Sequence, residues 1–365
     1  MKLCFLLASY NKFGGVERVV INLANLLSKN KDVHITLFSY CDDGENGPFM
    51  IDDSIELKHI YNRPIPLHRG FIPAVRNLNK DIRLSNYDIL VGCSSMYFPL
   101  AVCGTLFLNC KLVLWEHSHF FLNTEVRFQR YCRKFWVEFA SAIVVLTNTD
   151  RINYLNNIKN RNVFCINNML DRRLINNASK YNQKSKSILS VGRLCPVKNF
   201  HAIIEIGRQL FLKYPEWKWD IWGDGEMRSL LQTAINEAGL QNYITLKGWS
   251  DNIYDLYQNY SIFISTSKNE GFGLAILEAL ANRLPVVAFD VLCGPKEMIT
   301  NGVNGFLISD LNIKKMEAAI SELIENPSKR QEFSDATQNN LNQFSEEVVL
   351  RKWMTLVENV TKRIL

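Results

Sequence analysis

The segment Glu270–Glu278 combines two carboxylates with a glycine-rich helix start. It follows an apolar run that we expect to be a strand, so Glu270 lies at the mouth of a helix and Glu278 about two turns inside it. Free amides near Gly273 and Leu274 would bind a phosphate, and the carboxylates would accept hydrogen bonds from sugar hydroxyls. The plainer interpretation is a helix start that Glu270 stabilises through the helix dipole, with Glu278 on an exposed face.

Two cations follow another apolar run that predicts a strand. Arg193 comes directly after Gly192, and Lys198 lies five residues further on. On a loop between a strand and a helix, these side chains can clamp a diphosphate from two sides, and arginine can do so with two hydrogen bonds. Basic loop residues are more often simply solvated, so the spacing alone leaves both interpretations open.

The pair Gly14-Gly15 directly follows the first predicted strand and opens a helix. Two glycines let the backbone approach a phosphate closely, and the helix N-terminus offers free amides. The pair lacks the three-glycine spacing of a dinucleotide fingerprint, which argues against a dehydrogenase. A tight turn is the alternative.

His117 lies at the carboxyl end of a predicted strand, between Glu116 and Ser118. A histidine at this place can donate to a substrate oxygen, although a buried structural histidine is the common alternative. His119 competes for the role, and we favour His117 because it is nearer the strand end. A metal site would need a third ligand, and none is near in sequence, so we predict no metal.

These residues need parallel strands to position them, and the first half of the chain supplies a set. Apolar runs alternate there with helical stretches such as 16–28, whose apolar residues fall on one face. Runs that are apolar on both faces are typical of a parallel sheet covered by helices. The predicted strands are Lys2–Ser9, Val33–Ser39, Ile55–Ile60, Ile89–Gly92, Lys111–Trp115, Ala142–Leu146 and Val163–Ile166.

A second alternation follows the polar segment 171–187, which indicates a linker. It predicts strands at 188–191, 217–222, 244–246, 262–265, 286–288 and 305–308, with helices at 200–214, 226–238, 253–258 and 274–281.

We therefore predict an α/β protein with two Rossmann-like, doubly wound domains. They comprise residues 1–175 and 176–345, and a C-terminal helix over 346–365 packs back toward the first domain. Ligands in such folds bind beyond the carboxyl ends of the strands, so we expect the domains to face each other across a cleft.

Composition narrows the classes of protein. A hydrophobic fraction of 47% excludes a disordered chain, and no apolar run approaches the roughly 20 residues that a spanning helix needs. The nine cysteines include no Cys-x-x-Cys pair, so neither a disulfide framework nor a zinc cluster is predicted. The N-terminus lacks the long apolar stretch of a secretory signal, and we predict a cytoplasmic protein.

The excess positive charge of +6 lies entirely in the first half. Residues 1–175 carry 21 Lys and Arg against 15 Asp and Glu, whereas residues 176–365 carry 21 of each. The bias predicts that the first domain meets an anionic membrane surface or a phosphate-bearing substrate, although chance can produce a bias of this size. We predict no nucleic-acid partner.

Taken in order, the motifs resemble those of the retaining glycosyltransferases of family 4, which have the GT-B fold. The resemblance covers nearly the whole chain and is most specific from 191 to 307. Cys195 departs from it, because the family more often has an acidic residue nearby. The matching residues are Gly14-Gly15-x-Glu17, Glu116-His117, Gly192-Arg193 with Lys198, Gly223-Asp224-Gly225, Lys247-Gly248-Trp249, Glu270 to Glu278, Gly294-Pro295-Lys296-Glu297 and Asn301-Gly302-Val303-Asn304-Gly305.

The resemblance implies a nucleotide-sugar donor whose hexosyl or N-acetylhexosaminyl group is transferred. Arg193 and Lys198 would neutralise the diphosphate, and the turn at Gly14 and Gly15 would close over it. The base would lie near Gly248, which suggests a uridine nucleotide.

The same resemblance assigns the sugar-binding groups. Glu278 would hold the ribose, Glu270 would bind a hydroxyl of the donor sugar, and His117 would touch that sugar near the reacting carbon. Backbone groups at Phe272, Gly273 and Leu274 would meet sugar and phosphate. Attack would occur on the face that the diphosphate leaves, with the leaving phosphate taking the acceptor proton, and neither a metal nor another cofactor would be required.

A basic and aromatic segment at 127–136 indicates where the acceptor binds. Arg127, Arg130 and Lys134 share one helix face. With the cations of an earlier helix, they form a candidate surface for anionic lipid or a lipid diphosphate acceptor at the inner face of the membrane; an ordinary solvated helix face is the alternative. The earlier cations are Arg69, Arg76, Lys80 and Arg83.

We therefore predict a transferase that moves a sugar onto a lipid-linked or surface glycan. A catalytically idle nucleotide-sugar-binding or scaffold protein of the same fold is the first alternative, and a GT-B nucleotide-sugar epimerase is the second. The presence of Arg193, Lys198, Glu270 and Glu278 together favours the transferase, because a scaffold has no use for that set. An epimerase would need an additional acid–base pair, and none stands out.

Overall fold

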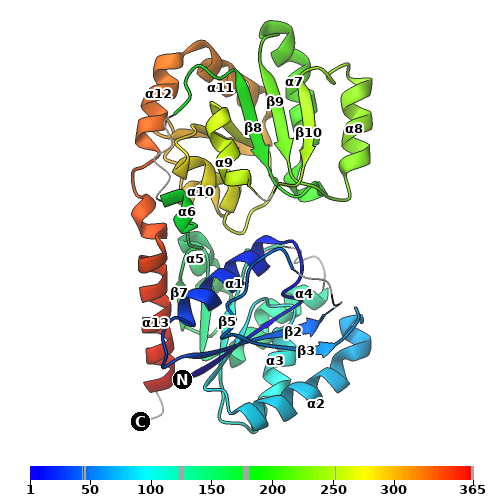
Figure 1. Ribbon diagram of the computed structural model, residues 1–365, viewed down its shortest axis with the longest axis vertical. Coiled ribbons are helices and arrows are strands. Elements are labelled where there is room, and N and C mark those ends of the chain that lie inside the picture. The colour runs from blue at the N-terminus through cyan, green and yellow to red at the C-terminus, as the bar shows by residue number, and fades with distance from the viewer. Residues whose placement is uncertain (43, 45–46, 123–126, 176–180, 251, 363–365) are drawn as a thin grey trace. The chain divides into compact units, whose positions relative to one another are not determined.

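The computed structural model describes residues 1–42, 44, 47–122, 127–175, 181–250 and 252–362. The chain divides into two compact units, residues 1–169 with 347–365 and residues 170–346 (Figure 1). Within the predicted linker, α6 (Arg172–Ile175) is helical and β8 begins at Ser187, while residues 176–180 lie outside the described part. No helix of the described residues is both long and apolar enough to cross a membrane.

The first unit contains a parallel sheet in the order β3-β2-β1-β4-β5-β6-β7. This order reverses between β1 and β4, as in a doubly wound fold. All seven strands predicted for the first half are confirmed. They are β1 (Lys2–Leu7), β2 (His34–Cys41), β3 (Glu56–Tyr61), β4 (Ile89–Gly92), β5 (Lys111–Trp115), β6 (Ala142–Val145) and β7 (Val163–Cys165).

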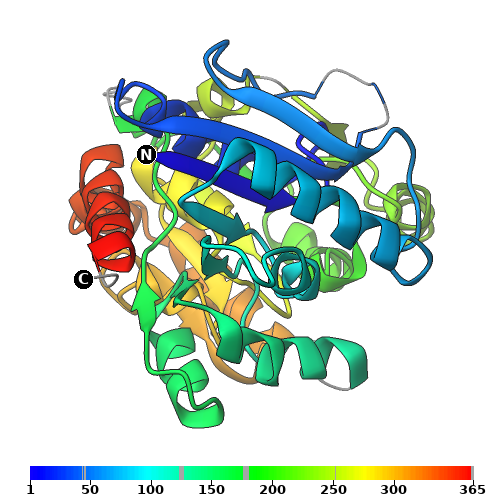
Figure 2. The same ribbon diagram turned by 90° about the horizontal axis from the view of Figure 1, so that it is seen from below.

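Helices cover both faces of this sheet. Cys4 and Leu6 of β1 face a core that includes Leu78 of α2 and Leu100 of α3, and α2 lies against β3 and α3 (Figure 2). The opposite face carries Phe5, whose ring contacts Trp115. The helices are α1 (Gly15–Leu27), α2 (Leu67–Ser85), α3 (Phe98–Gly104), α4 (Arg127–Lys134), the 3-10 turn η1 (Trp136–Phe139), α5 (Asn148–Asn157) and α13 (Glu346–Lys362).

The last helix, α13, completes the first unit. Its Trp353 ring packs edge-on against Trp115 with centroids 4.7 Å apart, on the face of the sheet opposite α2. Trp353 is buried, with Val349, Leu356 and Val357 beside it on the apolar side of the helix. The C-terminal residues therefore supply part of the core of the N-terminal unit.

The second unit repeats the architecture with the strand order β10-β9-β8-β11-β12-β13, all parallel. The order reverses between β8 and β11. All six strands predicted for the second half are confirmed. They are β8 (Ser187–Val191), β9 (Lys218–Trp222), β10 (Ile244–Gly248), β11 (Ile262–Ser265), β12 (Val286–Phe289) and β13 (Gly305–Ile308).

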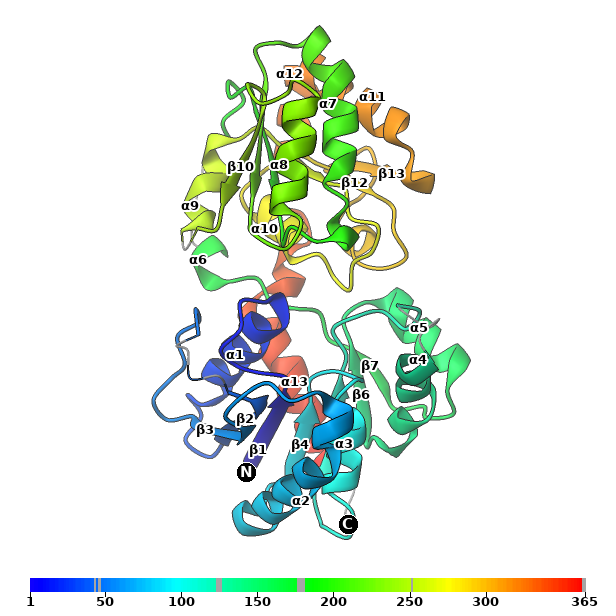
Figure 3. The same ribbon diagram turned by 90° about the vertical axis from the view of Figure 1, so that its right-hand side faces the viewer.

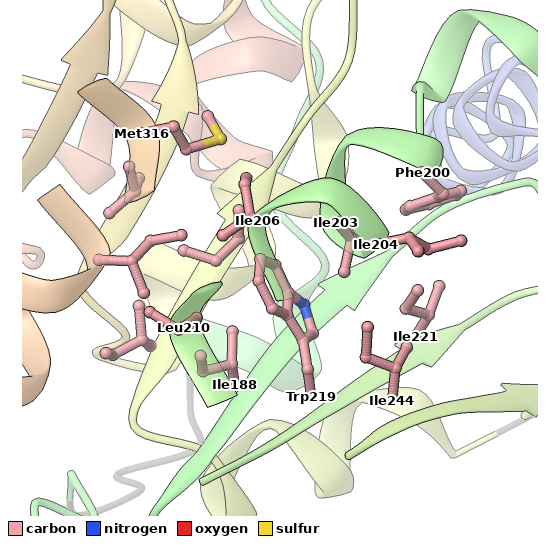
Figure 4. Packing of buried hydrophobic residues seen from close by; sticks show 14 of the residues in the cluster. Ile188, Phe200, Ile203, Ile204, Ile206, Leu210, Trp219, Ile221, Ile244 and Met316 are labelled. Carbon is pink, nitrogen blue, oxygen red and sulfur yellow. The ribbon is translucent and has the colours of Figure 1, made fainter. Parts of the chain in front are cut away.

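The core of the second unit forms where α7, α8 and α11 pack on one face of the sheet (Figure 3). Trp219 of β9 lies among Ile203, Ile206 and Leu210 of α7 (Figure 4), and its indole N–H donates to Ser190 Oγ at 3.0 Å. The helices are α7 (His201–Lys213), α8 (Arg228–Glu237), α9 (Ile253–Leu256), α10 (Leu274–Ala281), α11 (Ile313–Glu325) and α12 (Pro327–Ala336). Short 3-10 turns are η2 (Pro196–Lys198), η3 (Tyr257–Asn259), η4 (Pro295–Glu297), η5 (Ser309–Leu311) and η6 (Leu341–Phe344).

Truncation of Trp353 tests the contribution of α13. We expect Trp353→Ala to lower the free energy of unfolding by about 3 to 5 kcal/mol, because it removes buried aromatic surface and leaves a cavity beside Trp115. Denaturant unfolding measures this change. The exposed neighbour Thr355 provides the control, since Thr355→Ala should change stability by less than about 0.5 kcal/mol. Similar losses in both variants would contradict this packing role.

Candidate functional site

The switch in strand order between β8 and β11 brings two predicted site residues into contact. Loops that follow adjacent parallel strands on opposite sides of such a switch diverge and leave room for a ligand. Lys198 lies on the loop after β8 and Glu270 on the loop after β11, and the ammonium Nζ lies 2.6 Å from Glu270 Oε1. Both side chains are mostly buried, with 24% and 11% exposed. The sequence places them 72 residues apart, and the topology joins them.

Close backbone contacts join the loops after β8, β9 and β10. Gly223 has φ +126°, and a Cβ there would lie 2.0 Å from Gly192 O, so no other residue fits. Gly223 N donates to Gly248 O at 2.8 Å, and Leu194 N donates to Asp224 O at 2.9 Å. The predicted site residue Gly248 thus belongs to the same loop cluster as Gly192.

The start of α10 is the place where the sequence predicts a phosphate-binding site. Its N-cap is Gly273 with φ +95°, and no side chain caps the first turn. Gly294 lies very close to the loop before α10, because a Cβ on Gly294 would lie 2.5 Å from Phe272 O. Phe272 is itself buried against Phe344, with ring centroids 5.7 Å apart. The start of α10 is therefore fixed, and Leu274 is the first helical residue after it.

Arg193 is the most accessible of the predicted site cations. Its guanidinium is 69% exposed and lies 3.2 Å from Glu226 Oε2, a carboxylate that is itself 52% exposed. An exposed ion pair contributes little to stability, at most about 1 kcal/mol. An incoming diphosphate can therefore replace Glu226 as the partner of Arg193.

Glu278 is buried on α10, with 5% of its surface exposed. The interpretation that it lies on an exposed helix face is wrong. The Tyr257 hydroxyl donates to Glu278 Oε2 at 3.0 Å, which orients the carboxylate. Sequence reasoning missed Tyr257, because no motif marks it and its contact with Glu278 depends on the packing of the turn η3 against α10.

In the first unit, Gly14 and Gly15 begin α1 directly after the loop that follows β1. Gly14 is the N-cap, and its φ of −157° is ordinary extended backbone. A Cβ at Gly14 would lie 2.0 Å from Glu17 Oε2, so the glycine provides room for the Glu17 carboxylate. The Glu17 carboxylate therefore occupies part of the space that the two glycines were predicted to leave for a phosphate.

His117 follows β5 and is partly buried, with its ring 4.5 Å from the Trp115 ring. Burial lowers the pKa of His117 to about 4, so the imidazole is neutral near pH 7. Its Nε2 has no hydrogen-bond partner among the described residues. His119, the competing candidate, accepts a hydrogen bond from Phe121 N at Nδ1, at 3.1 Å, and therefore holds the loop.

Three charged side chains surround the loop that carries His117. Burial alone would raise the pKa of Glu116, but the Arg133 guanidinium and hydrogen bonds from Ser95 and Ser118 outweigh it and keep the pKa below its usual value. Asp150 differs, since burial raises its pKa to about 7. Sequence reasoning treated Glu116 only as part of a motif and did not identify Arg133 or Asp150.

The basic segment of α4 has two faces. Arg127, Arg130 and Lys134 are exposed as predicted, whereas Arg133 is 4% exposed and points inward. Exposed aromatic residues lie in α4 and at the turn η1 that follows it. They are Phe128, Tyr131, Phe135 and Phe139, of which Tyr131 and Phe135 stack with centroids 4.9 Å apart.

A cavity of about 550 Å³ lies at the opposite edge of the second sheet, near the amino ends of β8 and β9. Its buried cation, Arg330, donates from Nη1 to Ile324 O at 2.9 Å and from Nη2 to Gln183 O at 3.1 Å. These bonds give Arg330 a structural role at the end of α11. The cavity is therefore separate from the loops that carry the predicted site.

Within the described ranges, no group of three His, Cys, Asp or Glu side chains is arranged to hold a metal ion. Arg193, Lys198 and the N-terminus of α10 contribute positive charge at the carboxyl edge of the second sheet.

Comparison with protein families matches most of the chain in two parts. Residues 13–174 match the model described as "Glycosyltransferase Family 4", and residues 171–340 match "Glycosyl transferases group 1".

Relatives and solved structures agree with these matches. An uncharacterized glycosyltransferase of Haemophilus influenzae is 29% identical over 96% of this chain and 98% of its own length. The poly(ribitol-phosphate) alpha-N-acetylglucosaminyltransferase of Staphylococcus aureus is 33% identical over 217 residues. This aligned region covers 59% of this chain and 43% of that protein. The structure of S. aureus TarM in complex with Fondaparinux, alpha-GlcNAc-glycerol and UDP superposes with a TM-score of 0.83 at 19% identity, covering 98% of this chain and 99% of that one.

The opposite pKa shifts of Asp150 and His117 predict opposite pH dependences of stability. Between about pH 4 and 7, folded Asp150 keeps a proton that the unfolded chain releases, so its contribution falls as pH rises. Between about pH 4 and 6.5, the unfolded chain protonates His117 and the folded chain does not, so its contribution rises with pH. Each slope is at most about 1.4 kcal/mol per pH unit.

We therefore expect Asp150→Asn to gain stability relative to wild type as pH rises through this range, and His117→Gln to lose it. Denaturant unfolding at about pH 4.5, 5.5 and 6.5 measures both differences. Differences that stay constant with pH in both variants would contradict the two assignments.

Proposed function

Because the chain belongs to the family 4 type of GT-B glycosyltransferases, we propose that it transfers a hexosyl or N-acetylhexosaminyl group from a UDP-sugar to a glycan acceptor with retention of configuration. The UDP and glycan ligands named for the TarM structure support a uridine donor and a glycan acceptor. The glycosyltransferases among the relatives support a hexosamine or hexose as the transferred group.

The observation that carries the proposal is the contact between Lys198 and Glu270 at the switch in strand order. Their charges suit the two parts of a nucleotide sugar. The ammonium group has three donors, so it can hold Glu270 and a phosphate oxygen together. Glu270 keeps acceptor capacity for a sugar hydroxyl and would be repelled by the phosphate without Lys198 beside it.

The reaction breaks the bond between the anomeric carbon and the oxygen of the diphosphate. Negative charge grows on that oxygen as positive charge grows on the sugar ring, so groups that stabilise the leaving diphosphate lower the barrier. Lys198, Arg193 and the amides at Gly273 and Leu274 supply this stabilisation. The acceptor oxygen attacks from the face that the diphosphate leaves, and its proton passes to the leaving phosphate oxygen.

Other residues orient the donor. Glu278, held by Tyr257, accepts hydrogen bonds from the ribose, and the loop at Gly248 lies against the base. Gly14, Gly15 and His117 belong to the first unit, and their assignment to the diphosphate and the sugar comes from the family resemblance. We propose that no metal takes part, because Arg193, Lys198 and the start of α10 offer positive charge to the diphosphate.

A donor screen tests the proposal. The protein is incubated with several UDP-, GDP- and ADP-sugars in EDTA, and nucleotide release is followed by mass spectrometry. We expect UDP release from at least one UDP-sugar and a product with the anomeric configuration of the donor. Nucleotide binding without release would favour the idle-binding alternative, and activity that EDTA abolishes would contradict the metal-free mechanism.

Substitution of the central ion pair tests the site. We expect Lys198→Ala and Glu270→Ala each to lower turnover at least about tenfold, because each removes a group that stabilises the leaving diphosphate or holds the sugar. Circular dichroism should show that both variants stay folded. The control is Lys213→Ala, which breaks an exposed lysine–glutamate pair of 2.8 Å elsewhere in the same unit and should keep wild-type turnover. Wild-type rates in both site variants would remove the assignment.

The exposed side of α4 supports a second part of the proposal, peripheral attachment to an anionic membrane that carries the acceptor. We call the residues Arg127, Arg130, Lys134, Phe128, Tyr131, Phe135 and Phe139 the α4 surface. Lysine and arginine attract anionic headgroups, and exposed aromatic rings suit the boundary between headgroups and acyl chains. The exposed cations of α2, which are Arg69, Arg76, Lys80 and Arg83, carry charge of the same sign.

Vesicle flotation tests this surface. We expect more protein to float with anionic vesicles than with neutral ones, and the triple variant Arg127→Gln, Arg130→Gln, Lys134→Gln to lose most of the difference. The matched control is Arg208→Gln, Lys314→Gln, Lys315→Gln, which removes the same charge from exposed positions of the second unit. Equal recovery of wild type with both vesicle types would overturn the membrane proposal.

A further inference from the structure

We propose that Arg133 is a positioning residue for His117, acting through Ser118 and Glu116. The inference rests on the proposed function for its kinetic consequence, while its structural part concerns the loop 116–122 alone. Arg133 lies on the same helix as the cations of the α4 surface. Its side chain, however, is buried and contacts the loop 116–122.

The Glu116 carboxylate accepts hydrogen bonds from the backbone at His117 and Ser118. Its Oε1 accepts hydrogen bonds from His117 N at 3.0 Å and from Ser118 N at 3.1 Å. The same oxygen accepts from the Ser118 hydroxyl at 2.8 Å. These bonds turn the chain sharply after β5 and fix the main chain from which the imidazole of His117 projects.

Arg133 holds the loop from the other side. Its Nη2 donates to Ser118 Oγ at 2.8 Å, its Nη1 donates to Leu122 O, and its Nε lies 3.5 Å from Glu116 Oε2. Ser118 Oγ therefore accepts from Arg133 and donates to Glu116. The two charged side chains are only 5% and 2% exposed, so each compensates a charge that would otherwise be buried alone.

The remaining charged neighbour is Asp150 of α5, whose Oδ1 accepts from Phe120 N at 2.8 Å. Asp150 thus anchors the middle of the loop, and Arg133 anchors both of its ends, at Ser118 and Leu122. A lysine can replace the charge of Arg133, but one ammonium group at the end of a flexible chain cannot reproduce the planar fork that reaches both anchors. Arg133→Lys should therefore loosen the loop without leaving Glu116 unpaired.

A double-mutant cycle tests whether Arg133 acts through His117. In donor turnover, we expect Arg133→Lys to lower kcat about tenfold with little change in the donor KM, because misplacing one catalytic side chain has effects of this size. In the His117→Ala background, the same change should alter kcat less than about twofold. Ser118→Ala, a smaller perturbation of the same bridge, should show the same dependence on His117. Arg151→Lys, an exposed arginine of α5, is the matched control.

Equal losses of kcat in the wild-type and His117→Ala backgrounds would show a general structural role and overturn the proposal. Wild-type kcat in both Arg133→Lys and Ser118→Ala would also overturn it.

A second measurement needs no substrate. NMR titration of the His117 ring, assigned with His117→Gln, should show its pKa rising from about 4 toward the usual 6.5 in Arg133→Lys as water reaches the loop. An unchanged pKa would overturn the positioning claim, whereas a raised pKa in a protein that turns over no nucleotide sugar would overturn the proposed function alone.

Discussion

The contact between Lys198 and Glu270 depends on one topological constraint, the reversal of strand order between β8 and β11. A parallel sheet wound in one direction buries its carboxyl edge under successive crossovers, and only the reversal leaves two loops free to diverge. Opposite charges placed there satisfy each other in the absence of ligand and remain able to bind a ligand with both anionic and hydroxyl groups. The glycines of the neighbouring loops follow from the same constraint, because backbones must approach within contact distance to reach this edge.

The strands, and the helix α10 at Leu274–Ala281, were predictable because apolar periodicity and glycine spacing are local signals. Motifs placed after strands also singled out Glu270 and Lys198 one by one, but their contact with each other depends on the strand order and was not predicted. Tyr257 and Arg133 could not be found in this way. The role of each depends on a partner on another element, Glu278 on α10 and Ser118 after β5, and nothing near either residue in sequence indicates that partner.

The helix α4 shows why a charge pattern alone does not assign function. Four cations lie within eight residues, and helical spacing correctly groups Arg127, Arg130 and Lys134 on one exposed side. Arg133 has the same charge but is buried, where it pairs with Glu116. A single short helix thus presents solvent-facing positive charge while its inner side stabilises the loop that carries His117.

The return of α13 to the first unit has a consequence for biosynthesis. During translation, residues 1–169 leave the ribosome first, yet Trp115 lacks its contact with Trp353 until α13 emerges. The whole of residues 170–346 is synthesised in between and has its own core. The core of the unit that begins first is therefore completed last, and a nascent chain arrested before residue 347 would leave Trp115 without the cover that Trp353 provides.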